Sequence, residues 1–325
     1  MAETPDKKET PAEEAVASDI QTEGTQVSGS PIKSDDKTPS LDVPSPAGPS
    51  LLDQYTAHYP DWAKDFARKY FTKTLTQFII YGNVRDLVAA GGDDGKSEYV
   101  SLHEFLVDEL FASRDIVLFY DRSSGIHFAD KESQKDFNRA LSGYDTIFGT
   151  DYAKKLPKDP VRVLAVLQNY FRLRLADGKR IACIIDYAET VIPMAEASMY
   201  SEGDRNALVF LQKWAHDPLF LSSDFTVTLI TQNLSELNQQ IVQSPYTAEI
   251  QIPIPDEEAR RTYVDSYLEE LQGEWAQHSE VEASALASNT AGLGFIQLRS
   301  IIADVIENRT ALTYEVLSSM KKEVI

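Results

Sequence analysis

Residues 180–186 read RIACIID, and residues 225–231 read FTVTLIT. Each is a short run of apolar, largely β-branched residues, which is typical of a strand buried on both faces. Longer amphipathic segments separate these runs from three others, FIIYGN at 78–83, DIVLFY at 115–120 and EIQIPI at 249–254. Strands that alternate with amphipathic helices indicate a sheet covered by helices on both faces. The sequence therefore predicts an α/β fold with a five-stranded parallel sheet.

The segments between the predicted strands carry signals of helix ends. Asp159 followed by Pro160 is typical of a helix start, and Gly178 is typical of a helix end. Trp62 and Phe66, four residues apart, begin an apolar stripe of helical spacing ahead of the first strand. We expect that helix to pack against the sheet.

Three domains are predicted along the chain. Residues 1–50 contain no Phe, Trp or Tyr and hold seven of the fifteen prolines, so they cannot bury enough apolar area to fold. They are predicted to be a disordered acidic leader, either a spacer or a docking tail. Residues 51–255 hold all five predicted strands, whereas residues 256–325 show only helical patterns. The last segment is predicted to be a small all-helical lid subdomain.

Composition excludes several classes of function. A formal net charge of −20 disfavours binding to nucleic acid, and no apolar run reaches the length of a membrane-spanning helix. The single cysteine, Cys183, offers neither a disulfide nor a thiolate metal site, and the five histidines lack metal-ligand spacing. The N-terminus carries no secretory or organelle signal, so the cytoplasm is the expected location.

Polar residues follow two of the predicted strands, where ligands of open parallel sheets bind. Asp186 ends the run at 180–186 and is a candidate ligand of Mg²⁺. Asn233 follows the run at 225–231 and is a candidate for positioning water. Either residue is equally well explained as a cap of the next turn or helix.

Residues 90–97 read AGGDDGKS, which fits a loose phosphate-loop pattern. In that interpretation Gly95 belongs to the loop, Lys96 reaches the terminal phosphates and Ser97 contacts Mg²⁺. The alternative is a Gly-rich surface loop. It is favoured because the pattern does not begin at the end of the first strand, and because two aspartates would stand beside the phosphates.

The segments IQIPIPDEEARR at 250–261 and AGLGFIQLRSII at 291–302 resemble the AAA ATPase family, a branch of the P-loop NTPases. The resemblance covers residues 78–308 through the order and type of elements. It implies that ATP and Mg²⁺ are the cofactors, that Asn233 orients the attacking water and that Arg299 lies near phosphate. Tyr187 stands where the family has a catalytic glutamate, which leaves Glu189 as the best available base.

An AAA frame with such altered motifs is similar to the degenerate first module of tandem bacterial and plastid AAA proteins. The resemblance implies a module that binds ATP with weak or absent hydrolysis and acts by assembly with itself or with a related AAA ATPase. The alternative is a catalytically inactive adaptor or scaffold on the same fold.

Overall fold

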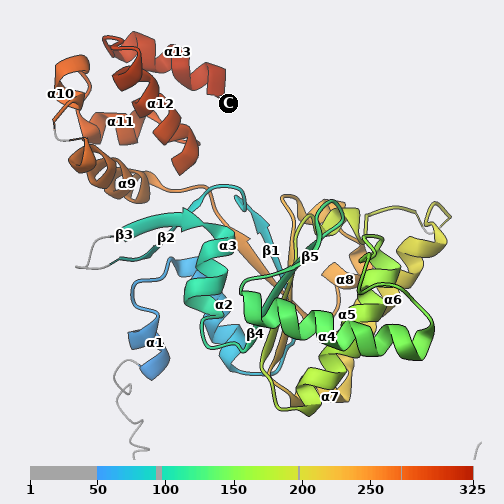
Figure 1. Cartoon of the computed structure of the whole chain (residues 1–325). Helices are drawn as coiled ribbons and strands as arrows, with labels where there is room; N and C mark the ends of the chain where they lie inside the picture. Colours follow the sequence, from blue (N-terminus) through green and yellow to red (C-terminus); the bar gives the residue numbers. More distant parts are fainter. Residues whose placement is uncertain (1–49, 93–96, 197, 272, 325) are drawn as a thin grey trace, which may run out of the picture. The chain divides into compact units, whose positions relative to one another are not determined.

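The structure is a computed structural model, and it describes residues 50–92, 97–196, 198–271 and 273–324 (Figure 1). The predicted leader therefore lies outside the described residues except for Ser50. A six-stranded sheet forms the centre of the fold. Its strand order is β5 (Gly125–Phe128), β4 (Ile116–Asp121), β6 (Ile181–Ile185), β7 (Phe225–Ile230), β1 (Gln77–Gly82) and β8 (Thr247–Ile252).

The predicted α/β class is confirmed, with one strand more than predicted. The five predicted runs form β1, β4, β6, β7 and β8, which pair in parallel. The additional strand, β5, pairs antiparallel with β4 at the edge of the sheet. It has only four residues and follows a turn in which the Asp121 carboxylate accepts hydrogen bonds from the N–H groups of Ser123 and Ser124. So short a run carries too little periodicity to be recognised as a strand.

Helices cover both faces of the sheet. On one face lie α4 (Lys131–Phe148), α5 (Pro160–Ala176), α6 (Glu202–His216) and α7 (Pro218–Ser222). On the other lie α2 (Asp61–Phe71), α3 (Leu102–Phe105) and a π-helical turn at Leu106–Leu110. Shorter helical segments are α1 (Leu51–Tyr55), α8 (Gln239–Val242) and the 3-10 turns Ala188–Thr190 and Leu234–Glu236.

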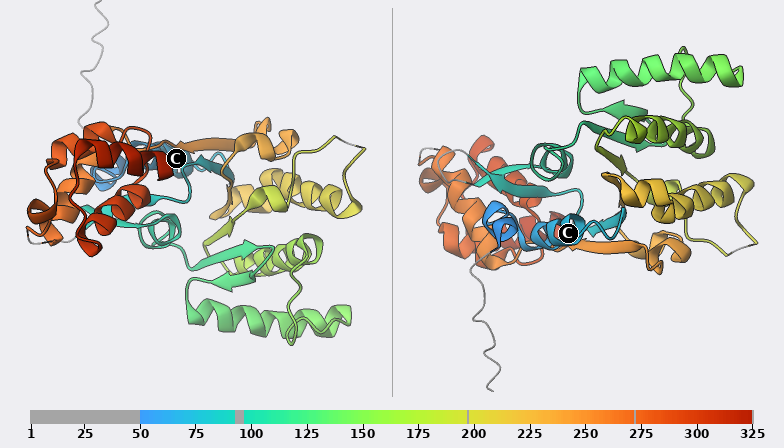
Figure 2. Two further views of the ribbon diagram at one scale, coloured as in Figure 1. Left: turned by 90° about the horizontal axis from the view of Figure 1, so that it is seen from above. Right: turned by 90° about the horizontal axis from the view of Figure 1, so that it is seen from below.

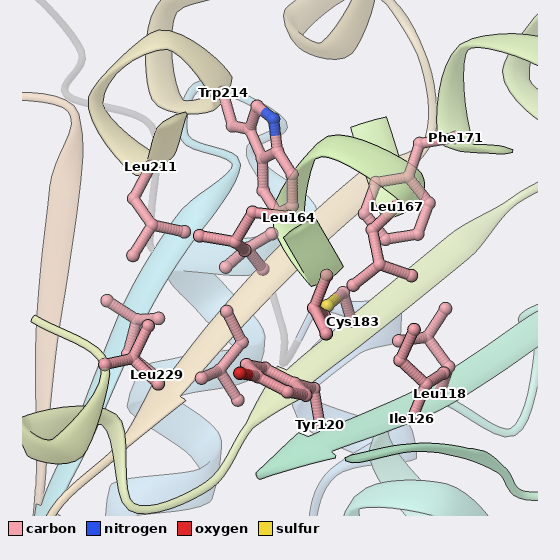
Figure 3. Packing of buried hydrophobic residues seen from close by; sticks show 14 of the residues in the cluster. Leu118, Tyr120, Ile126, Leu164, Leu167, Phe171, Cys183, Leu211, Trp214 and Leu229 are labelled. Carbon is pink, nitrogen blue, oxygen red and sulfur yellow. The ribbon is translucent and has the colours of Figure 1, made fainter. Parts of the chain in front are cut away.

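Successive side chains of β6 point to opposite faces of the sheet, so this strand contributes to both apolar cores. Cys183 points toward the α5 face, whereas its neighbours Ala182 and Ile184 belong to the core under α2. Figure 3 shows Leu164 and Phe171 of α5 packed over Cys183. Because each fully buried side chain of this size contributes roughly 1.5–3 kcal/mol, the two layers fix the sheet between them.

After β8 the described residues form helices and no further strand. The elements are α9 (Glu257–Glu270), α10 (Trp275–His278), α11 (Ala283–Asn289), α12 (Phe295–Glu307) and α13 (Tyr314–Val324), which share their own apolar core. Arg260 of α9 is buried, and its guanidinium donates to the carbonyls of Ala287 and Pro255. Its role is therefore to hold α9 against α11.

A two-stranded antiparallel hairpin, β2 (Leu87–Gly91) with β3 (Ser97–Ser101), stands between β1 and α3. The chain thus leaves β1 through four residues, 83–86, that lead into a hairpin, where the parallel-sheet pattern predicts a helix. This connection places residues 83–86 at the carboxyl end of β1.

Gly82, the last residue of β1, is expected to tolerate no side chain. Its φ is +97°, and a Cβ there would lie 2.5 Å from the backbone oxygen of Ile252. We expect Gly82→Ala to lower the free energy of unfolding by about 2 kcal/mol in urea titration, because strain and a backbone clash add. Gly178→Ala is the matched control, since its φ is +75° with open space around it; an equal loss in both variants would contradict the clash.

Candidate functional site

The carboxyl ends of β1, β7 and β6 lie side by side, because β7 pairs in parallel with both of the other strands. This edge is where an open α/β sheet binds its ligands. Asp186 follows β6, Asn233 follows shortly after β7, and residues 83–86 follow β1. The sheet order therefore brings these three strand tips together.

Asp186 is held by an arginine that follows β1. Its two carboxylate oxygens accept hydrogen bonds from the two terminal nitrogens of Arg85, at 2.8 and 2.7 Å. The N–H of Tyr187 donates a further bond, at 2.8 Å. The Asp186 side chain is only 8% exposed, whereas that of Arg85 is 30% exposed. The planar guanidinium thus binds the carboxylate in a bidentate manner, through both of its terminal nitrogens.

His103, from the first turn of α3, completes this cluster. Its Nε2 lies 3.1 Å from Asp186 Oδ2, within ion-pair distance, but the ring N–H is not aligned for a hydrogen bond. Burial alone would raise the pKa of Asp186. His103, Arg85 and the Tyr187 N–H outweigh burial and lower that pKa to about 2. Asp186 is therefore an anion at neutral pH.

Arg85 is also covered from one side. Its guanidinium carbon lies 3.9 Å from the ring centroid of Tyr187, a cation–π contact. Tyr187 adopts a left-handed backbone conformation, with φ of +50°, which costs free energy in a residue with a Cβ. In this backbone conformation the Tyr187 ring lies over the guanidinium of Arg85. The ring covers one side of the ion pair with Asp186.

The backbone amides after β1 are engaged within the protein. Gly82 N–H donates to Gln232 O at 3.0 Å and Asn83 N–H donates to Ile252 O at 2.9 Å. The next amide, of Val84, donates to Gly82 O at 2.8 Å. A phosphate-binding loop needs such amides to point at the ligand. Here the amides of Gly82 and Asn83 donate to residues near the ends of β7 and β8, and that of Val84 donates back to Gly82, so these three amides are not available to a phosphate.

Asp86, which follows Arg85 in the sequence, caps α12 of the C-terminal helical part. Its carboxylate accepts from the N–H groups of Phe295, at 2.8 Å, and Ile296, at 2.9 Å, in the first turn of α12. Asn83 donates a third bond to it, at 2.9 Å. Helix N-termini attract anions, and in this fold a protein carboxylate supplies the charge. Gly294 permits the approach, because a Cβ there would lie 2.4 Å from the carboxylate.

Comparison with known proteins identifies the family. Residues 45–253 match the model of the AAA+ chaperone N-terminal Rossmann-like domain, and residues 258–325 match that of the AAA+ chaperone second helical domain. The chain belongs to the AAA+ chaperone family. Among curated proteins, none matches it. A chain in the solved E. coli MS115-1 HORMA:CdnC:Trip13 complex is similar at 13% identity and a TM-score of 0.47, over 84% of this chain and 81% of that one.

Within this AAA+ chaperone chain, Ser97 is the one predicted phosphate-loop site residue that the structure describes. Gly95 and Lys96 fall outside the described residues. Ser97 is the first residue of β3 and pairs with Gly91, the last residue of β2. Four residue steps of about 3.4 Å separate Gly91 from Leu87, so Ser97 lies at the end of the hairpin remote from Asp86. It lines a cavity of about 260 Å³ together with Arg299.

The two remaining predicted residues have different surroundings. Asn233 is exposed, and its side-chain amide donates to Glu236 at 3.0 Å. Glu189 lies in the 3-10 turn after Asp186, and one of its carboxylate oxygens is buried with no hydrogen-bond partner among the described residues. No cluster of three or more metal-ligating side chains, and no helix able to cross a membrane, occurs in the described ranges of the AAA+ chaperone chain.

Sequence reasoning missed Arg85, Asp86 and His103. An adjacent arginine and aspartate directly after the first strand were the available signal, since opposite charges at a strand tip need partners when buried. Their partners are distant in sequence, so the signal could not have named them.

Proposed function

We propose that this AAA+ chaperone family member is a module that does not hydrolyse ATP and acts through protein contacts, by assembly with itself or with a related AAA ATPase. The bidentate bond from Arg85 to Asp186 carries the proposal. In a working ATPase an aspartate at this position holds Mg²⁺. Here a fixed positive side chain engages both of its oxygens.

The neighbouring groups support the same interpretation. The amides of Gly82, Asn83 and Val84 donate to carbonyls within the protein, and the Asp86 carboxylate occupies the N-terminus of α12. Tyr187 follows Asp186 directly and cannot serve as a carboxylate base at neutral pH. For ATP to bind at this edge, Arg85 would have to leave Asp186 and an acidic side chain would stand beside the phosphates. We therefore propose that the module functions by contacting other proteins. Its membership of a chaperone family is consistent with that function.

Titration with ATP and Mg²⁺ tests this proposal. We expect no saturable heat in isothermal calorimetry and no phosphate release above that of a buffer blank. Arg85→Ala serves as the comparison, because it frees the Asp186 carboxylate without touching residues 93–97. Saturable, magnesium-dependent ATP binding that Lys96→Ala abolishes would overturn the proposal and establish the ATP-binding alternative.

A further inference from the structure

A charged cavity of about 960 Å³ opens beside the N-terminal half of α4. It lies away from the Asp186 edge, next to the start of β4 and the end of α5. Its lining carries six cationic side chains, Arg114, Lys131, Lys135, Arg139, Arg174 and Lys179. In a chain whose net charge is −20, such a concentration of positive charge is unusual.

Five carboxylates also line this cavity, and three of them are ion-paired within the protein. Asp136 binds Arg174 at 2.6 Å, and Asp177 binds the same guanidinium at 2.8 Å. Asp115 pairs with Arg180 at 3.0 Å. Because Arg174 carries one charge, it offsets only one of the two carboxylates of Asp136 and Asp177. Asp130 has no ion pair and accepts N–H groups in the first turn of α4, so its carboxylate remains an anion.

Four cations remain without an ion pair among the residues that the structure describes: Lys131, Lys135, Arg139 and Lys179. All four are exposed. Asp130 and Glu132 are the lining carboxylates without an ion pair among those residues, and both are exposed. Six cations and five carboxylates line the cavity, so the charge available to a ligand is positive, which favours an anionic ligand.

An apolar groove of about 280 Å³ continues along the same two helices. It lies between the C-terminal half of α4 and α5, which run alongside each other (Figure 2). Ile147, Phe148 and Leu173 line it while being 77%, 57% and 48% exposed. Tyr170 lines the groove and donates to Asp136 of the charged cavity at 3.0 Å, so the two sites adjoin. Exposed apolar side chains around a groove are typical of a binding surface.

We propose that the cavity and the groove together bind an acidic segment of a partner protein, with carboxylates over the four cations and apolar side chains in the groove. This inference rests on the proposed function, in which the module acts through protein contacts. A nucleic acid or a free phosphate would satisfy the cations and leave Phe148 and its neighbours in water. A peptide that combines glutamates with leucine or phenylalanine satisfies both halves.

Fluorescence anisotropy with the full chain provides the test. The probe is a fluorescein-labelled peptide of glutamates interspersed with leucine and phenylalanine. We expect binding that weakens as salt is raised, and at least about tenfold weaker binding for the double variant Lys135→Glu, Arg139→Glu. Phe148→Ser is expected to weaken binding about tenfold by removing an apolar contact. The control is Lys155→Glu with Lys213→Glu, two exposed lysines outside the cavity, which carries the same charge change.

Four outcomes would overturn the inference: no binding of the probe, equal weakening by the control variant, equal affinity for a peptide of glutamates alone, or tighter binding of an RNA oligonucleotide. Repeating the titration with ATP and Mg²⁺ separates the two proposals. Peptide binding that persists while ATP also binds contradicts only the proposed function. If the chain binds neither the peptide nor ATP, only the proposed docking site is contradicted.

Discussion

Replacement of Arg85 by alanine is expected to lower the free energy of unfolding by about 3 kcal/mol. The variant leaves the buried Asp186 carboxylate without its two strongest hydrogen bonds, and removing one partner of a buried pair costs more than the pair contributes. The loss stays at the low end for buried pairs because Arg85 is 30% exposed, so water can enter the space it vacates. Urea titration followed by circular dichroism measures the effect.

Three further variants make this expectation specific. Arg85→Lys keeps the positive charge but loses the fork, so about half of the loss should remain. Asp186→Asn added to Arg85→Ala should recover stability, because the uncompensated charge is gone. Arg68→Ala is the matched surface control, since Arg68 and Asp53 are 62% and 38% exposed; no measurable loss is expected there, because water screens an exposed ion pair. Equal losses for Arg68→Ala and Arg85→Ala would show that Asp186 does not depend on its arginine.

The strands could be predicted because each is a continuous apolar run. Every residue of β6 and β7 is buried, and such runs are visible without knowledge of the partners. The hairpin was missed for the opposite reason. The strand β2 reads LVAAG, with alternating burial and two alanines, and β3 reads SEYVS, with no fully buried residue. Their pairing with each other, and not with the main sheet, is decided by tertiary contacts.

The candidate site divides in the same way. Asp186 could be found, because an aspartate after four apolar residues is a local pattern. The bond from Arg85 joins residues 101 positions apart, and the bond from Phe295 to Asp86 spans 209 positions. Such pairs depend on strand order and on where the helical part meets the end of β1. Neither the strand order nor the position of the helical part can be predicted from local sequence periodicity.

Replacement of Asp86 by alanine is expected to cost about 3 kcal/mol and to loosen the start of α12. Asp86 is 7% exposed, and its carboxylate accepts two backbone N–H groups there, which the variant would leave without partners. Hydrogen exchange measures the effect locally: the amides of Phe295 and Ile296 should lose protection, whereas those of β6 should keep theirs.

Asp256→Ala is the control that separates capping in general from this particular junction. Asp256 caps α9 through the N–H of Ala259 at an exposed position, so about 1 kcal/mol should be lost, with α12 unaffected. Asp86→Asn keeps one acceptor oxygen and should fall between the two variants. If Phe295 and Ile296 remain protected in Asp86→Ala, the end of β1 does not hold α12. In that case the helix N-terminus would be free for another anion, and the proposal that the module does not hydrolyse ATP would lose one of its supports.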